Sequence, residues 1–82
     1  MRWEEILREA LEDYLAHLHL RWVDLEHQVT SDPDGVLIEC ESIEKILFTM
    51  AGRNQDEDDS IDIAIASFQE LIERAEHIIS RR

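Results

Sequence analysis

Apolar residues in the first third of the chain recur at the spacing of an α-helix. From residue 2 to residue 29 they come at steps of three and four, and no glycine or proline interrupts them, so they fall on one face of a helix. This stripe consists of Trp3, Leu7, Ala10, Leu11, Tyr14, Leu15, Leu18, Trp22, Leu25 and Val29. Apolar and polar residues also alternate over residues 18–29, as in a half-buried strand. The helical period fits more positions and predicts one helix over about 2–29, with a strand at residues 22–29 as the alternative.

A second helical period follows the stretch TSDPDG at residues 30–35. Ser31 or Asp32 can cap a helix, and Pro33 suits the first helical position because its missing N–H would have no partner there. The apolar residues that follow alternate steps of four and three; they are Val36, Cys40, Ile43, Leu47 and Met50. Gly52 is the residue type that commonly follows a helix in a left-handed conformation. These features predict a helix over about 33–51.

Residues 30–41 fit two other interpretations less well. A twelve-residue EF-hand calcium loop would place acidic residues and Gly35 at suitable positions, but its first ligand would be Thr30, and the chain has no second such loop. A β-hairpin with DPDG as its turn would occupy about residues 23–40 and give an α+β fold. The helix start accounts for more of the residues and is the prediction that we follow.

The third period is the most regular. Residues 52–62, GRNQDEDDSID, form an acidic linker whose last acids can cap a helix and interact favourably with the positive end of its dipole. The apolar stripe that follows consists of Ile61, Ala64, Ile65, Phe68, Leu71, Ile72, Ala75, Ile78 and Ile79. Arg81 and Arg82 then place cations at the negative end of the dipole. The pattern predicts a helix over about 59–81 that begins at Asp59.

Three helices joined by short connections pack most simply as an antiparallel bundle. We therefore expect a single all-α domain over residues 1–82, built as a three-helix bundle. A chain of 82 residues is near the lower limit for a self-sufficient core, and a small bundle often completes its core by forming a homodimer. We expect such a dimer here.

The charge of the chain narrows the choice of partners. Twenty Asp and Glu stand against eight Lys and Arg, which gives a formal net charge of −12. Such a surface repels phosphate backbones and anionic membranes and attracts basic proteins. No segment has the unbroken apolar length that a membrane span needs, and the single cysteine cannot form an intrachain disulfide. We expect a cytoplasmic protein with a protein partner, without direct nucleic-acid or membrane binding.

The sequence contains few motifs that are typical of a catalytic, cofactor or metal site. The chain has no glycine-rich phosphate loop, no CxxC pair and no Ser/His/Asp set that the predicted helices would assemble, so we expect no enzyme and no cofactor. Cys40 falls on the apolar face of its helix and is expected in the core. Two stripes carry metal-ligand residue types; they are Asp13, His17 and Asp24 on the first helix and Glu70, Glu73 and His77 on the third. The apolar period places both stripes outside, where solvated ion pairs are the simpler interpretation, and we expect no metal.

Some apolar residues miss the predicted bundle faces and indicate a contact surface. These are Leu20 and Val23 on the first helix and Leu37 and Phe48 on the second. The carboxylates expected to act with them in partner binding are Asp56, Glu57, Asp58, Asp59 and Asp62. The favoured hypothesis is a small acidic, non-enzymatic interaction module that self-associates and presents an acidic face to a macromolecular partner. The alternatives are an inhibitor or immunity-type protein that blocks a basic nucleic-acid-binding protein by charge mimicry, a metal-binding bundle, and a structural subunit of a larger assembly.

Overall fold

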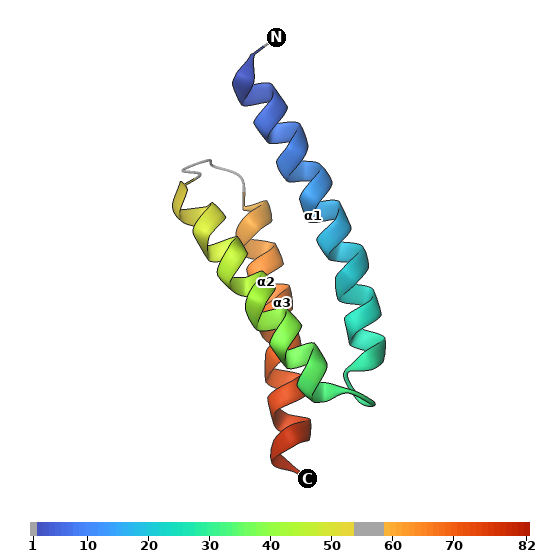
Figure 1. Ribbon diagram of the computed structural model, residues 1–82. Coiled ribbons are helices and arrows are strands. Elements are labelled where there is room, and N and C mark those ends of the chain that lie inside the picture. The colour runs from blue at the N-terminus through green and yellow to red at the C-terminus, as the bar shows by residue number, and fades with distance from the viewer. Residues whose placement is uncertain (1, 54–58) are drawn as a thin grey trace.

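The computed structural model describes residues 2–53 and 59–82, which form three α-helices (Figure 1). They are α1 (Trp3–Gln28), α2 (Pro33–Arg53) and α3 (Ser60–Ser80). Successive helices run in opposite directions, so α1 and α3 are parallel and α2 is antiparallel to both. The predicted all-α three-helix bundle is confirmed. The hairpin alternative is wrong, because residues 23–28 continue α1 and residues 33–40 open α2, and the described ranges contain no strand.

The turn between α1 and α2 is fixed by hydrogen bonds at both helix ends. The N–H groups of Ser31 and Asp32 donate to the carbonyl of Gln28, at 3.1 and 2.8 Å. The Asp32 carboxylate then accepts the N–H of Gly35, with 3.2 Å between N and Oδ1, and Pro33 is buried at the first helical position. The predicted helix start is confirmed, with Asp32 as the capping residue.

Two predicted helix ends differ from the structure. Gly52 lies inside α2, and no described glycine has a positive φ angle, so its predicted left-handed role is wrong. Glycine permits that conformation without requiring it, and the helix continues past it. At the start of α3, Asp59 holds the N-cap position, but its side chain makes no capping hydrogen bond; its carbonyl accepts the N–H of Ile63 at 2.9 Å. The acids there, with Asp62 in the first turn, act through their charge near the helix dipole.

The core is formed mainly by α2 and α3, which make the most extensive helix contact, while α1 packs more against α3 than against α2. The buried apolar residues are Leu18, Leu25 and Val29 from α1 and the turn after it, Val36, Cys40, Ile43 and Leu47 from α2, and Ile61, Ile65, Phe68, Leu71, Ile72 and Ala75 from α3. All buried residues of α1 therefore lie in its C-terminal half. Residues 2–10 are exposed throughout.

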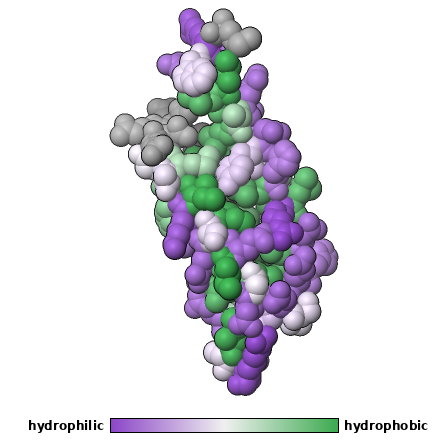
Figure 2. Space-filling view, viewed as in Figure 1, coloured by the Kyte–Doolittle hydropathy of each residue, from purple (hydrophilic) through white to green (hydrophobic). Residues whose placement is uncertain are grey.

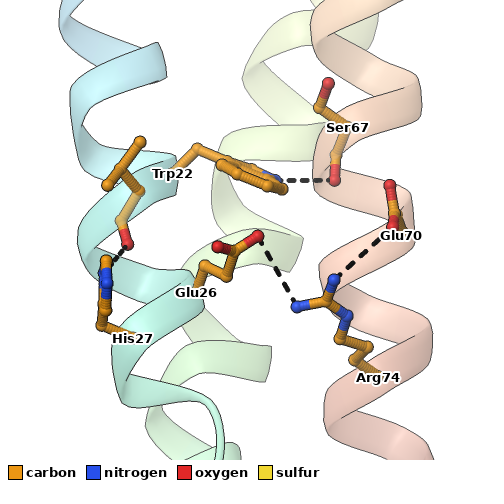
Figure 3. A network of polar contacts seen from close by, with 7 residues as sticks. Trp22, Glu26, His27, Ser67, Glu70 and Arg74 are labelled. Atoms are coloured by element: carbon orange, nitrogen blue, oxygen red, sulfur yellow. Dashed lines mark hydrogen bonds and ion pairs between the residues drawn. The ribbon is translucent and has the colours of Figure 1, made fainter.

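Polar contacts reinforce the attachment of the C-terminal half of α1. The Arg21 guanidinium makes a two-bond ion pair with the Glu39 carboxylate of α2, with 2.7 Å between Nη2 and Oε1. The indole N–H of Trp22 donates to the carbonyl of Ser67 on α3 at 2.9 Å (Figure 3). These bonds tie α1 to both of its neighbours at the same level of the bundle. We call the end of the molecule below them, with the turn between α1 and α2, the closed end.

The opposite end of the molecule is open. α1 has 26 residues against 21 in each of the other helices, and its first turns extend beyond them (Figure 1). The molecule measures 53 × 20 × 16 Å, with a radius of gyration of 14.3 Å, against about 12 Å for a compact domain of this length. We call the region formed by residues 3–16 of α1, the last turns of α2 and the first turns of α3 the open end.

The close approach of Gly35 and Asp32 gives a test of the helix cap. A Cβ atom on Gly35 would clash with the carboxylate of Asp32, so Gly35→Ala must displace the capping carboxylate. In the wild-type background, the gain in helix propensity of about 1 kcal/mol is expected to be cancelled by loss of a cap of similar worth. In an Asp32→Ala background, the same substitution is expected to stabilise the protein by up to ~1 kcal/mol. Urea unfolding of the four proteins measures both effects, and equal effects in the two backgrounds would contradict the cap.

Candidate functional site

Two grooves lie along α1, one at its first turns and one at its middle. The first, the α2-side groove, has a volume of about 440 Å³ and lies between α1 and the last turns of α2. Its lining residues are Glu4, Leu7, Arg8, Ala10, Leu11, Tyr14 and Met50. Leu7 is 52% exposed, and Ile46, one turn before Met50, is also exposed. The apolar stripe of α1 is therefore only partly covered on this flank.

The second, the α3-side groove, has a volume of about 410 Å³ and lies between the middle of α1 and the first turns of α3. α1 contributes Glu12, Leu15, Ala16, Leu18, His19 and Trp22, and α3 contributes Ser60, Ile63, Ala64, Ser67 and Phe68. Of these, Phe68 is buried and Ile63 is 65% exposed. Trp22 crosses from α1 to Ser67 (Figure 3). The groove is thus a largely apolar channel between two parallel helices.

Carboxylates border the α3-side groove on both helices. On α1, Glu12 lines the groove; on α3, Asp59 and Glu70 flank it, and all three side chains are exposed. Glu5 and Glu9 lie on the same flank of α1 as Glu12, before the groove begins. The two on α3 lie four residues before and seven residues after Ile63, which lines the groove, and so they share its flank. The apolar channel therefore has the carboxylate of Glu12 on its α1 side and those of Asp59 and Glu70 on its α3 side, with Glu70 also paired to Arg74.

Ion pairs close the α3-side groove toward the closed end. Nη1 of Arg74 lies 3.6 Å from Oε2 of Glu26, and Nη2 lies 3.7 Å from Oε1 of Glu70 (Figure 3). The side chains are roughly half exposed, so each pair contributes at most about 1 kcal/mol. Arg74 joins α1 to α3 beyond Trp22 and Ser67, and the channel ends there.

The predicted apolar partner-binding residues do not form one patch. On α1, Leu20 is exposed and Val23 is half-buried. On α2, Leu37 is half-buried and packs against the core, whereas Phe48 is half exposed. Phe48 lies nine residues after Glu39, which faces α1, so it projects from the opposite flank of α2.

The predicted partner-binding carboxylates fall into two groups. Asp59 and Asp62 are exposed at the start of α3, and Asp59 is on the border of the α3-side groove. Asp56, Glu57 and Asp58 lie outside the residues that the structure describes.

The sequence pattern assigns most residues of the α3-side groove to the core. Leu15, Trp22 and Phe68 all fit the period of buried residues. That period cannot distinguish a face covered by a neighbouring helix from a face that borders a groove. Ile63 is the available signal, because it is a large apolar residue that lies off the stripe of its own helix.

The two stripes of histidine and carboxylate do not assemble into a metal site. Nδ1 of His17 donates to the carbonyl of Asp13 at 2.8 Å and lies 3.8 Å from its carboxylate, so the ring is held by its own helix. Glu70 pairs with Arg74. Within residues 2–53 and 59–82, no three His, Cys, Asp or Glu side chains gather closely enough to hold a metal ion.

Comparison with known proteins provides no assignment. No protein-family model, no curated protein and no solved structure matches the chain. In the part of the chain that the structure describes, none of the helices is both long and apolar enough to cross a membrane. The grooves and their charged borders are therefore the features that bear on function.

The ion pair between α1 and α2 lies next to a buried thiol. The hydrogen bond from Arg21 lowers the pKa of Glu39, against the opposing effect of desolvation. Cys40 is buried in α2, and this burial, with a smaller contribution from the Glu39 charge, raises the pKa of its thiol to about 11. The thiol therefore stays protonated in the folded protein at neutral pH and is a poor nucleophile.

The raised pKa of Cys40 predicts a loss of stability at alkaline pH. The thiol ionises near its ordinary pKa of 9.0 in the unfolded chain and near 11 in the folded protein. Between these values the unfolded state binds fewer protons than the folded state, so the free energy of unfolding falls as the pH rises. Wild-type protein is therefore expected to lose stability relative to Cys40→Ala between pH 9 and pH 11 in urea unfolding. A stability difference that stays constant over this range would contradict the burial of the thiol.

Proposed function

We propose that the protein is a small non-enzymatic interaction module that self-associates through its open end and presents an acidic surface to a basic macromolecular partner. The observation that carries this proposal is the amount of surface left uncovered. The accessible surface is 6112 Å², about 1000 Å² more than the roughly 5100 Å² expected of a compact monomer of this mass. A standard protein interface buries about 800 Å² on each partner. The surplus is therefore of the size that one dimer interface would cover.

Apolar residues at the open end supply the contact area. Trp3 is 71% exposed, and Ile6, Leu7 and Ile46 are exposed as well. Figure 2 shows apolar surface in the upper part of the molecule, bordered by polar residues. Burial of one large apolar side chain contributes about 1.5–3 kcal/mol. A second copy that covers the α2-side groove would also support the first turns of α1, where no residue is buried and where tertiary packing is what usually stabilises a helix.

The net charge of −12 opposes self-association and favours a basic partner. Arg21, Arg74 and Arg82 are each engaged with a carboxylate of this chain, and the net charge of −12 remains after all eight cations are counted. Added salt screens the repulsion between like copies as well as the attraction to a basic partner. Self-association is therefore expected to strengthen as salt rises, and binding of a basic partner to weaken.

Leu7→Glu tests the self-association surface. In sedimentation equilibrium, the wild-type mass is expected to rise from 9.7 kDa toward twice that value as salt and protein concentration increase. Leu7→Glu is expected to remain at 9.7 kDa, because it places a charge within the apolar contact. Ile38→Glu is the matched control, since Ile38 is 68% exposed near the closed end and the substitution adds the same charge.

A wild-type protein that sediments as a monomer at every salt and protein concentration would overturn self-association. Equal weakening by Leu7→Glu and Ile38→Glu would contradict the open end as its location.

A further inference from the structure

The α3-side groove has dimensions that suit one face of a helix. Its walls run from Glu12 to Trp22 on α1 and from Ser60 to Phe68 on α3, which are lengths of about 15 and 12 Å at 1.5 Å per residue. Its volume of about 410 Å³ lies within the range of ligand pockets, about 300–1000 Å³, and is too small to enclose a helix. It suits the row of side chains that a helix of about three turns presents at positions i, i+4 and i+7.

The groove combines an apolar lining with acidic borders. Leu15, Trp22 and Ala64 are half-buried along it, and Ile63 is largely exposed in its wall. The bordering carboxylates are those of Glu12 on α1 and of Asp59 and Glu70 on α3. A helix whose apolar side chains enter the groove would therefore have carboxylates along both of its flanks.

We propose that the α3-side groove binds an amphipathic helix of a partner protein that carries lysine or arginine on both sides of its apolar face. The apolar side chains would enter between α1 and α3, and the basic side chains would meet the carboxylates of the two borders. The inference rests on the proposed function in one respect, because that function includes a basic partner. The inference adds to that function the location of the binding site and the chemistry of the partner segment that binds there.

A second copy of the chain has no helix with the net positive charge that this groove would bind. Each of α1, α2 and α3 carries more acidic than basic residues, so another copy would place carboxylates against the carboxylates of the borders. Self-association is proposed instead for the α2-side groove, whose lining includes Arg8 as well as Glu4. The α2-side groove is lined by residues 4–14 of α1 and the α3-side groove by residues 12–22, so the two sites occupy mostly different levels of the helix.

Trp22 provides a direct reporter of groove occupancy. It lines the groove, and the only other tryptophan in the sequence is Trp3, so Trp3→Phe leaves one tryptophan, which can be excited selectively beside Tyr14. The probe is a synthetic peptide of about fourteen residues, with leucine at the helical period and lysine at the other positions. A peptide with glutamate in place of lysine is the control.

The lysine peptide is expected to shift the Trp22 emission of the full-length protein to shorter wavelength, because it removes water from the indole. The affinity is expected to fall as salt rises. The glutamate peptide is expected to leave the emission unchanged, because its charges repel those of the borders.

Two matched pairs of variants locate the binding. Ile63→Lys and Ile38→Lys replace isoleucines that are 65% and 68% exposed, but Ile63 lines the groove and Ile38 lies on α2. The first is expected to weaken peptide binding about tenfold or more, and the second less than about twofold. Glu12→Gln and Glu41→Gln each remove one exposed carboxylate, and Glu12→Gln alone is expected to lower both the affinity and its salt dependence. Circular dichroism checks that all four proteins keep their helices.

Each result bears on the site separately from self-association. A response that is lost in Ile63→Lys and kept in Ile38→Lys supports the groove, and it does so even if the protein is a monomer at every salt concentration. No response of Trp22 overturns the site while leaving self-association intact. Equal effects of Ile63→Lys and Ile38→Lys also overturn it, in favour of diffuse charge attraction. If Ile63→Lys instead abolishes self-association, the groove belongs to a second copy and the inference is wrong.

Discussion

The attachment of α1 through its C-terminal half is the contact on which the rest of the structure depends. Leu18, Leu25 and Val29 are the residues by which the first helix and its turn enter the core, while Arg21 and Trp22 add polar contacts to α2 and α3. The ion pair of Arg21 is partly exposed and screened by solvent, so apolar burial supplies most of the attachment. Because no residue of α1 before Leu18 is buried, the helix leaves one groove at its first turns and another at its middle.

The helix positions follow closely from the sequence because their signals are local. The predicted ranges 2–29, 33–51 and 59–81 compare with Trp3–Gln28, Pro33–Arg53 and Ser60–Ser80. The apolar period and the capping residue at the start of α2 are properties of neighbouring residues, and no knowledge of the packing is needed to recognise them. The predicted end of α2 at residue 51 falls short of the observed end at Arg53. The prediction relied on Gly52, and a glycine adopts the left-handed conformation only where helical hydrogen bonding already stops.

Burial could not be derived from the same pattern. Leu7 and Leu18 are eleven residues apart on one face of α1, and the pattern assigns both to the core, yet Leu18 is buried and Leu7 is half exposed. The difference arises from the greater length of α1 and from its one-sided attachment, which are properties of the assembled bundle. For the same reason, the pattern could not identify Leu15 and Trp22 as residues that line a groove. The acidity of the groove borders was visible in the sequence, because every helix is acidic whichever of its faces is covered.

Charge and uncovered apolar surface place opposite demands on this protein. A net charge of −12 keeps copies apart, whereas exposed apolar side chains favour association. Contact through charge alone would be unselective and would weaken at moderate salt, and contact through apolar area alone would accept many exposed apolar surfaces. An apolar channel with carboxylates on both sides requires a partner that presents apolar and basic side chains together, at the spacing of the channel and its borders. A partner that offers only one of them would leave either the apolar lining or the acidic borders without a matching surface, and this requirement is the source of selectivity that the geometry provides.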